Sequence, residues 1–152
     1  MSGSTTDPTA LTVRAGDCHR LAELTAPDCQ LAGVPASLAR CTSLVSLDLS
    51  GNLLGMSADL PEALATGLVN LRELNVARNR LVALPAALGE LKALARLDCR
   101  ENQLRAIPKS VDGCASLAEL YLGQNQITSV PESVGGESAL RVLFCFLSSN
   151  RF

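Results

Sequence analysis

A 23-residue period runs through most of this chain and constrains its fold more than any other feature. Three consecutive segments align without gaps: LRELNVARNRLVALPAALGELKA (71–93), LARLDCRENQLRAIPKSVDGCAS (94–116) and LAELYLGQNQITSVPESVGGESA (117–139). Residues 21–43 have the same period, and residues 44–70 repeat the pattern with four extra residues. Since one such unit cannot bury its apolar face alone, the period predicts a solenoid in which neighbouring units stack.

The pattern within one unit predicts its local structure. Leu74 and Val76 alternate with polar residues, which predicts a short strand with one buried face. Asparagine occupies the ninth position of four units, where a buried amide can pair with backbone groups of its own turn and of the adjacent unit. These residues are Asn52, Asn79, Asn102 and Asn125. Proline follows on the far side, as at Pro85, where it suits the start of a helical turn.

These motifs resemble the leucine-rich-repeat family in its LxxLxLxxNxLxxLPxxLxxLxx class, which is found in intracellular scaffold and Ras-suppressor-like proteins. The resemblance covers residues 21–152. It implies an α/β fold, a right-handed β-α superhelical solenoid of about five and a half repeats. The resemblance also implies a parallel sheet on the concave side and short helical turns or irregular loops on the convex side.

A single domain over residues 11–152 accounts for the repeats. Besides the full units at 21–43, 44–70, 71–93, 94–116 and 117–139, we expect a partial unit at 11–20 and a partial or irregular last unit at 140–152. Residues 1–10 are expected to form a disordered tail. The N-terminal segment has no signal-peptide pattern and the chain has no Asn-x-Ser/Thr sequon, so we expect a cytoplasmic protein.

Composition and charge exclude several classes of function. The net charge is −2 and only two lysines are present, so no basic stripe exists for a nucleic-acid backbone. The apolar stretches are too short to span a membrane. The only histidine is His19 and there is no Cys-x-x-Cys pair, which argues against a zinc site or a catalytic Cys-His or Ser-His-Asp arrangement. We therefore expect no nucleic-acid or membrane partner, no cofactor, no metal and no enzymatic activity.

Each of the six cysteines replaces a residue that the repeat buries: Cys18, Cys41 and Cys114 before a leading leucine, Cys99 and Cys145 on a strand, and Cys29 in an asparagine position. We expect all six to be buried thiols in a reducing compartment. A disulfide between Cys18 and Cys41 of stacked units is the alternative in an oxidising compartment.

Side chains beside the buried strand leucines point to the concave side. We call this surface the sheet face; it consists of three columns that begin at Glu23, Thr25 and Pro27, with the turn residues that follow them. The resemblance implies that partners dock on this face, and Arg and Tyr are the residue types that most often anchor protein interfaces. The predicted protein-binding residues are Arg72, Glu73, Asn75, Arg78, Arg96, Asp98, Arg100, Glu101, Glu119, Tyr121 and Gln124. The other interpretation is that these charges only solvate the sheet and pair across strands.

All three phenylalanines lie in the last unit, LRVLFCFLSSNRF, which departs from the repeat. A solenoid needs a cap, because its last repeat otherwise exposes a core layer and a strand edge. We hypothesise that Phe144, Phe146 and Leu147 form a hydrophobic contact, either within a longer protein or with a partner or second copy. Self-association or a larger assembly through this end is then expected. A self-folding, irregular cap is the alternative.

These features together predict a non-catalytic protein–protein interaction module. We expect a scaffold or adaptor in signalling that binds a partner protein on the concave sheet face. Two alternatives stay open at this point. One is a structural subunit of a large cytoskeletal or flagellar assembly, and the other is a regulatory subunit in a phosphatase or small-GTPase pathway.

Overall fold

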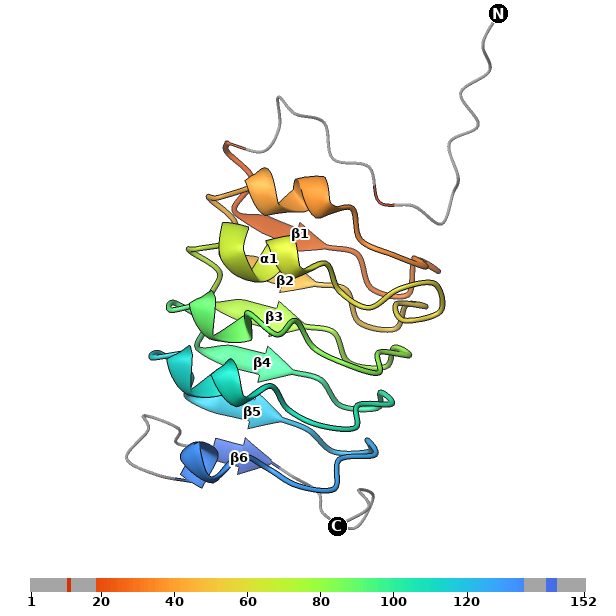
Figure 1. The fold of residues 1–152 in the computed structure, drawn as a ribbon. Helices are drawn as coiled ribbons and strands as arrows, with labels where there is room; N and C mark the ends of the chain where they lie inside the picture. The colour runs from red at the N-terminus through yellow and green to blue at the C-terminus, as the bar shows by residue number, and fades with distance from the viewer. Residues whose placement is uncertain (1–10, 12–18, 136–141, 145–152) are drawn as a thin grey trace, which may run out of the picture.

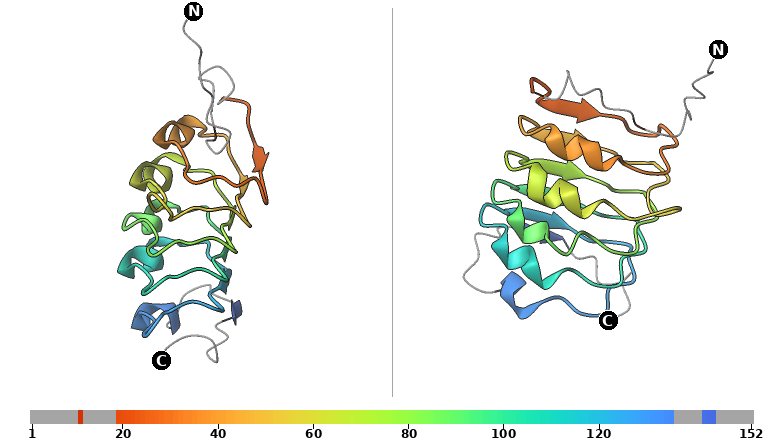
Figure 2. Two further views of the ribbon diagram at one scale, coloured as in Figure 1. Left: turned by 90° about the vertical axis from the view of Figure 1, so that its right-hand side faces the viewer. Right: turned by 45° about the horizontal axis from the view of Figure 1, so that its top comes forward.

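The computed structural model describes residue 11, residues 19–135 and residues 142–144. In this part the chain forms a stack of units, each with a strand on one side and a helical turn on the other (Figures 1 and 2). The strands are β1 (Glu23–Thr25), β2 (Ser46–Asp48), β3 (Glu73–Asn75), β4 (Arg96–Asp98), β5 (Glu119–Tyr121) and β6 (Val142–Phe144). The helical turns are η1 (Ala36–Arg40), α1 (Glu62–Gly67), η2 (Leu88–Glu90), η3 (Lys109–Gly113) and η4 (Glu132–Gly135).

The strands form one parallel sheet in chain order, from β1 to β6. The central leucine of each strand pairs with its equivalent in the next, as Leu74 does with Leu97 and Leu97 with Leu120. The longer unit between β2 and β3 does not shift this register, because Leu47 still pairs with Leu74. The predicted solenoid with a parallel sheet is therefore confirmed.

The longer second full unit has the short helix α1 on the side opposite the sheet, in line with the helical turns of the other units (Figure 1). This longer segment contacts the following unit through two carboxylates. Glu62 accepts hydrogen bonds from the backbone N–H groups of Ala86 and Ala87, at 2.7 and 3.0 Å, and Asp59 accepts one from Val82 at 2.9 Å. Glu62 and Asp59 thus supply acceptors for backbone groups that would otherwise face only water.

Aliphatic side chains fill the space between the sheet and the helical turns. In β4, Leu97 is fully buried while its neighbour Arg96 is exposed, as the alternation predicts. Each helical turn adds at least one buried aliphatic residue, such as Leu38 in η1 or Val111 in η3. Because each layer is narrow and repeats in every unit, leucine fills it and the chain needs few aromatic residues, which make up 3% of the sequence.

The asparagines form a ladder that ties each unit to the one before it, as predicted. In Asn102, the Oδ1 atom accepts from the backbone N–H of Leu81 in the preceding unit, at 3.0 Å. Its Nδ2 donates to the carbonyl of Val76 in that unit at 2.9 Å and to that of Cys99 in its own turn at 3.1 Å. The same pattern recurs at Asn52, Asn79 and Asn125.

The prediction that all six cysteines are buried is wrong for Cys29. This residue occupies the ladder position of the β1 unit but is exposed, and its Sγ donates to the carbonyl of Pro27 at 3.2 Å. The ladder bonds run toward the preceding unit, and β1 is the first strand of the sheet. Within residues 19–135 and 142–144, no strand precedes β1 that could supply ladder partners for a side chain at this position. Cys41, Cys99 and Cys114 are buried as predicted, whereas Cys18 and Cys145 lie outside the described residues.

This difference in burial predicts different thiol reactivity. Burial raises the pKa of the Cys114 thiol to about 11 and also raises that of the fully buried Cys99. Since the thiolate is the reactive form, both should resist disulfide reagents at about pH 8 in the native protein, whereas Cys29 should react quickly. Following the absorbance of released thionitrobenzoate tests this. Cys29→Ser should remove one fast-reacting equivalent, and Cys114→Ser should remove none; a fast equivalent lost with Cys114 would contradict the assignment.

Candidate functional site

The pairing register places most of the predicted binding residues side by side on the sheet face. Glu73, Arg96 and Glu119 occupy one column. Asn75, Asp98 and Tyr121 occupy the next. Because neighbouring strands lie about 4.8 Å apart, side chains within and between these columns are close enough to contact one another.

Asp98 differs from the expectation that it faces a partner. It is only 3% exposed, because the guanidinium of Arg100 covers its carboxylate. The pair is bidentate, with Nη2 of Arg100 2.6 Å from Oδ2 and Nε 2.9 Å from Oδ1. The pKa of Arg100 is raised, mainly because its guanidinium donates hydrogen bonds to Asp98. Two parallel bonds fix the plane of the guanidinium, so Asp98 holds Arg100 in position.

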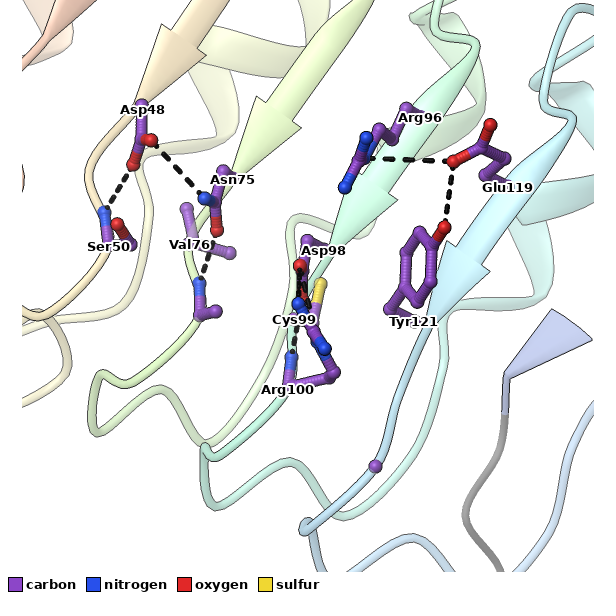
Figure 3. Close-up of polar contacts among 12 residues, drawn as sticks. Asp48, Ser50, Asn75, Val76, Arg96, Asp98, Cys99, Arg100, Glu119 and Tyr121 are labelled. Atoms are coloured by element: carbon purple, nitrogen blue, oxygen red, sulfur yellow. Dashed lines mark hydrogen bonds and ion pairs between the residues drawn. The ribbon is translucent and has the colours of Figure 1, made fainter.

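Tyr121 stands between two arginines (Figure 3). The guanidinium carbons of Arg96 and Arg100 each lie 5.2 Å from the centre of its ring, within the range of cation–π attraction. Its hydroxyl donates to Oε2 of Glu119 at 2.8 Å, and Nε of Arg96 lies 3.7 Å from the same oxygen. The pKa of Tyr121 is raised, mainly because its hydroxyl donates a hydrogen bond to Glu119.

These five residues, Arg96, Asp98, Arg100, Glu119 and Tyr121, form what we call the tyrosine cluster. Their side chains restrain one another, yet about half of each arginine side chain is exposed. The negative charges of Asp98 and Glu119 offset the positive charges of the two arginines. The cluster therefore presents an aromatic ring and two guanidinium edges in fixed positions without a large net charge.

A polar hollow of about 220 Å³ lies beside the tyrosine cluster and shares Arg96 with it. It is lined by Ser46, Leu47, Asp48, Glu73, Leu74, Asn75 and Arg96. The carboxylate of Asp48 accepts from the backbone N–H of Ser50 at 2.9 Å and from Nδ2 of Asn75 at 3.3 Å (Figure 3). Ser46 and Asp48 are absent from the predicted binding residues, although their places in the same columns, one unit earlier, could have indicated them.

The turn residues of the predicted site lie at the edge of the sheet face. Arg78, Glu101 and Gln124 are exposed and have positive φ values of 53°, 55° and 57°. The equivalent residue of the second unit is Gly51, and its lack of a side chain lets Arg78 reach Asp28 two units away, at 3.7 Å. The sequence analysis did not predict the ion pair between Asp28 and Arg78. The only sequence signal for it is that both residues occupy the same position of the repeat, directly before the asparagine position.

The remaining predicted site residues are placed as follows. Arg72 is exposed and immediately precedes β3. Phe144 belongs to β6, while Phe146 and Leu147 lie outside the described residues. The hydrophobic contact proposed for these residues at the C-terminal end therefore stays a prediction.

Two further observations concern the described part of the chain. No group of three His, Cys, Asp or Glu side chains there could hold a metal ion. No helix there is long and apolar enough to cross a membrane.

Comparison with known proteins agrees with this architecture. Models of the leucine-rich repeat match residues 43–66 and 69–127. The chain therefore belongs to the leucine-rich-repeat family. No curated protein matches it in sequence. The intracellular Ras-suppressor-like class within the family stays a prediction.

Similar solved structures include ectodomains of plant receptors. The BIR2 ectodomain of Arabidopsis thaliana superposes with a TM-score of 0.66 at 26% identity, over 84% of this chain and 66% of that one. A chain of the BIR3–SERK2 complex of Arabidopsis thaliana superposes with a TM-score of 0.64 at 31% identity, over 79% of this chain and 66% of that one. The PEPR1–AtPEP1 structure superposes with a TM-score of 0.76 at 30% identity, over 89% of this chain but only 19% of the other. The chain thus spans only part of the length of each relative.

Proposed function

We propose that the chain is a non-catalytic protein-interaction module that binds a partner protein through its sheet face. The tyrosine cluster carries the proposal, because it holds a half-buried tyrosine and two exposed arginines in place before any partner arrives. Such side chains lose little conformational entropy on binding, and Tyr and Arg are enriched at the residues that dominate binding energy. The family fold is generally a non-enzymatic interaction fold, and the similar BIR3–SERK2 complex supports a protein as the class of ligand.

We further propose that the module acts as a cytoplasmic scaffold or adaptor in signalling. Cys29, Cys99 and Cys114 are free thiols, which supports a reducing compartment. The mixed charges of the sheet face support a polar and specific partner, since charged groups arranged in a fixed pattern select against wrong partners.

Affinity capture from a lysate tests the proposal. The double variant Arg96→Ala/Tyr121→Ala removes the ring and one exposed guanidinium but keeps the pair between Asp98 and Arg100. Arg100 is left unchanged, because its removal would leave the buried carboxylate of Asp98 without its ion-pair partner. The double variant should bind a captured partner about 30-fold more weakly once the pair is purified, since anchor residues of this type contribute about 2 kcal/mol or more.

The matched control is Arg105→Ala, which removes an exposed arginine that is not part of the sheet face. It should leave the dissociation constant unchanged, and the urea midpoints of all variants should first be shown to agree. If every captured protein binds the double variant and the control equally well, the sheet face is not the binding surface.

A further inference from the structure

We infer that the polar hollow receives a lysine side chain of the partner. This inference rests on the proposed function and names the chemistry of one contact within it. The hollow lies over β2, β3 and β4, next to the tyrosine cluster, so a partner segment crossing the sheet face at the cluster would also pass over it.

The charges around the hollow are not balanced within the molecule. Among the described residues, the ion pairs are Asp28–Arg78, Arg96–Glu119 and Asp98–Arg100. Arg96, the one cation that lines the hollow, is thus paired with Glu119, and neither Asp48 nor Glu73 has a cationic partner in the described part of the chain. Glu23 lies in the same column as Glu73 and adds a further negative charge nearby. This end of the sheet face is therefore complementary to a cation.

The size of the hollow indicates a single side chain. Its volume of about 220 Å³ is below the range of about 300–1,000 Å³ that is usual for small-molecule sites. Its acceptors come from three residues on two strands: the Ser46 hydroxyl and the carboxylates of Asp48 and Glu73. An ammonium group has three donors and no acceptor, so it can use all three.

The fixed position of Asp48 favours lysine over arginine. Each of its carboxylate oxygens already accepts one hydrogen bond, from the Ser50 backbone and from Asn75. A guanidinium binds a carboxylate best as a planar, bidentate pair, which requires both oxygens along one edge. The ammonium of lysine is a compact charge that needs only one lone pair from each acceptor.

Nuclear magnetic resonance titration of the full chain with a short probe tests the inference. The probe is acetyl-Gly-Lys-Gly-amide, and the readout is the backbone amide shifts of residues 46–48 and 73–75. We expect saturable shifts with a dissociation constant on the order of 1–10 mM. Glu73→Gln and Asp48→Asn should each weaken binding by about threefold to fivefold, the upper end for an exposed ion pair. Glu90→Gln, an exposed carboxylate in η2, should have no effect.

Three results would overturn the inference: shifts that do not saturate, equal binding of a probe with norleucine in place of lysine, or tighter binding of a probe with arginine. The outcome is separable from that of the proposed function. If a captured partner depends on Arg96 and Tyr121 while the lysine probe leaves residues 46–48 and 73–75 unchanged, the sheet face binds a protein but the hollow does not take lysine.

Discussion

Asn102→Ala is expected to lower the free energy of unfolding by about 3–4 kcal/mol. The side chain is 8% exposed and bonds to both its own unit and the preceding one. Without it, the backbone N–H of Leu81 loses its acceptor and is left unpaired. The carbonyls of Val76 and Cys99 each lose one of two donors and keep the bond from Asn79 or Asn125. A buried group left unpaired costs about 1–3 kcal/mol, and no water can easily replace the amide between two packed units. Urea unfolding followed by circular dichroism gives the value.

Asn70→Ala is the matched control for this experiment. Asn70 is exposed, and its amide makes a single hydrogen bond, to the carbonyl of Thr42 at 2.8 Å. Water can replace that bond, so the decrease in the free energy of unfolding should stay below about 1 kcal/mol. Equal losses in the two variants would show that the ladder does not hold the units together.

Gly89→Ala is expected to destabilise the protein by about 2–3 kcal/mol. Gly89 lies in η2, where a Cβ atom would be 2.0 Å from the carbonyl oxygen of Ser110 and 3.2 Å from the Cα of Gly113. Both are backbone atoms of η3 in the next unit. They cannot yield as a flexible side chain does, so the two helical turns must move apart. Since neighbouring units contribute most of the stability of a solenoid, the separation should weaken the whole stack.

Gly33→Ala provides the comparison, because no atom lies within 4 Å of a Cβ at that position. It should be neutral or stabilise by up to about 1 kcal/mol, since alanine restricts the unfolded chain. The free energies of unfolding of both variants come from the same urea titrations. If Gly89→Ala is as stable as Gly33→Ala, the contact between η2 and η3 is looser than the structure shows.

The fold could be predicted from the sequence almost completely, because the repeat encodes it several times. The spacing of the leucines set which side chains face the core. The same leucine pattern around each strand set the register of one strand against the next, even across the longer unit at 44–70. The columns of the sheet face followed from that register. Asn79 and its equivalents could be assigned to the turn, since a polar residue that recurs among buried ones needs backbone partners.

The arrangement within the candidate site depended on contacts that no spacing encodes. Asp98 and Asp48 occupy equivalent positions, yet Asp98 is buried because Arg100 folds over it, while Asp48 stays half-buried in the polar hollow. The packing of Tyr121 between two arginines likewise reflects side-chain conformations, which depend on all neighbours at once. Cys29 shows the same limit. It is exposed although the repeat pattern assigns it a buried position, and β1 beside it is the first strand of the described sheet. A repeat pattern describes one unit and does not encode how units at the ends of the sheet differ.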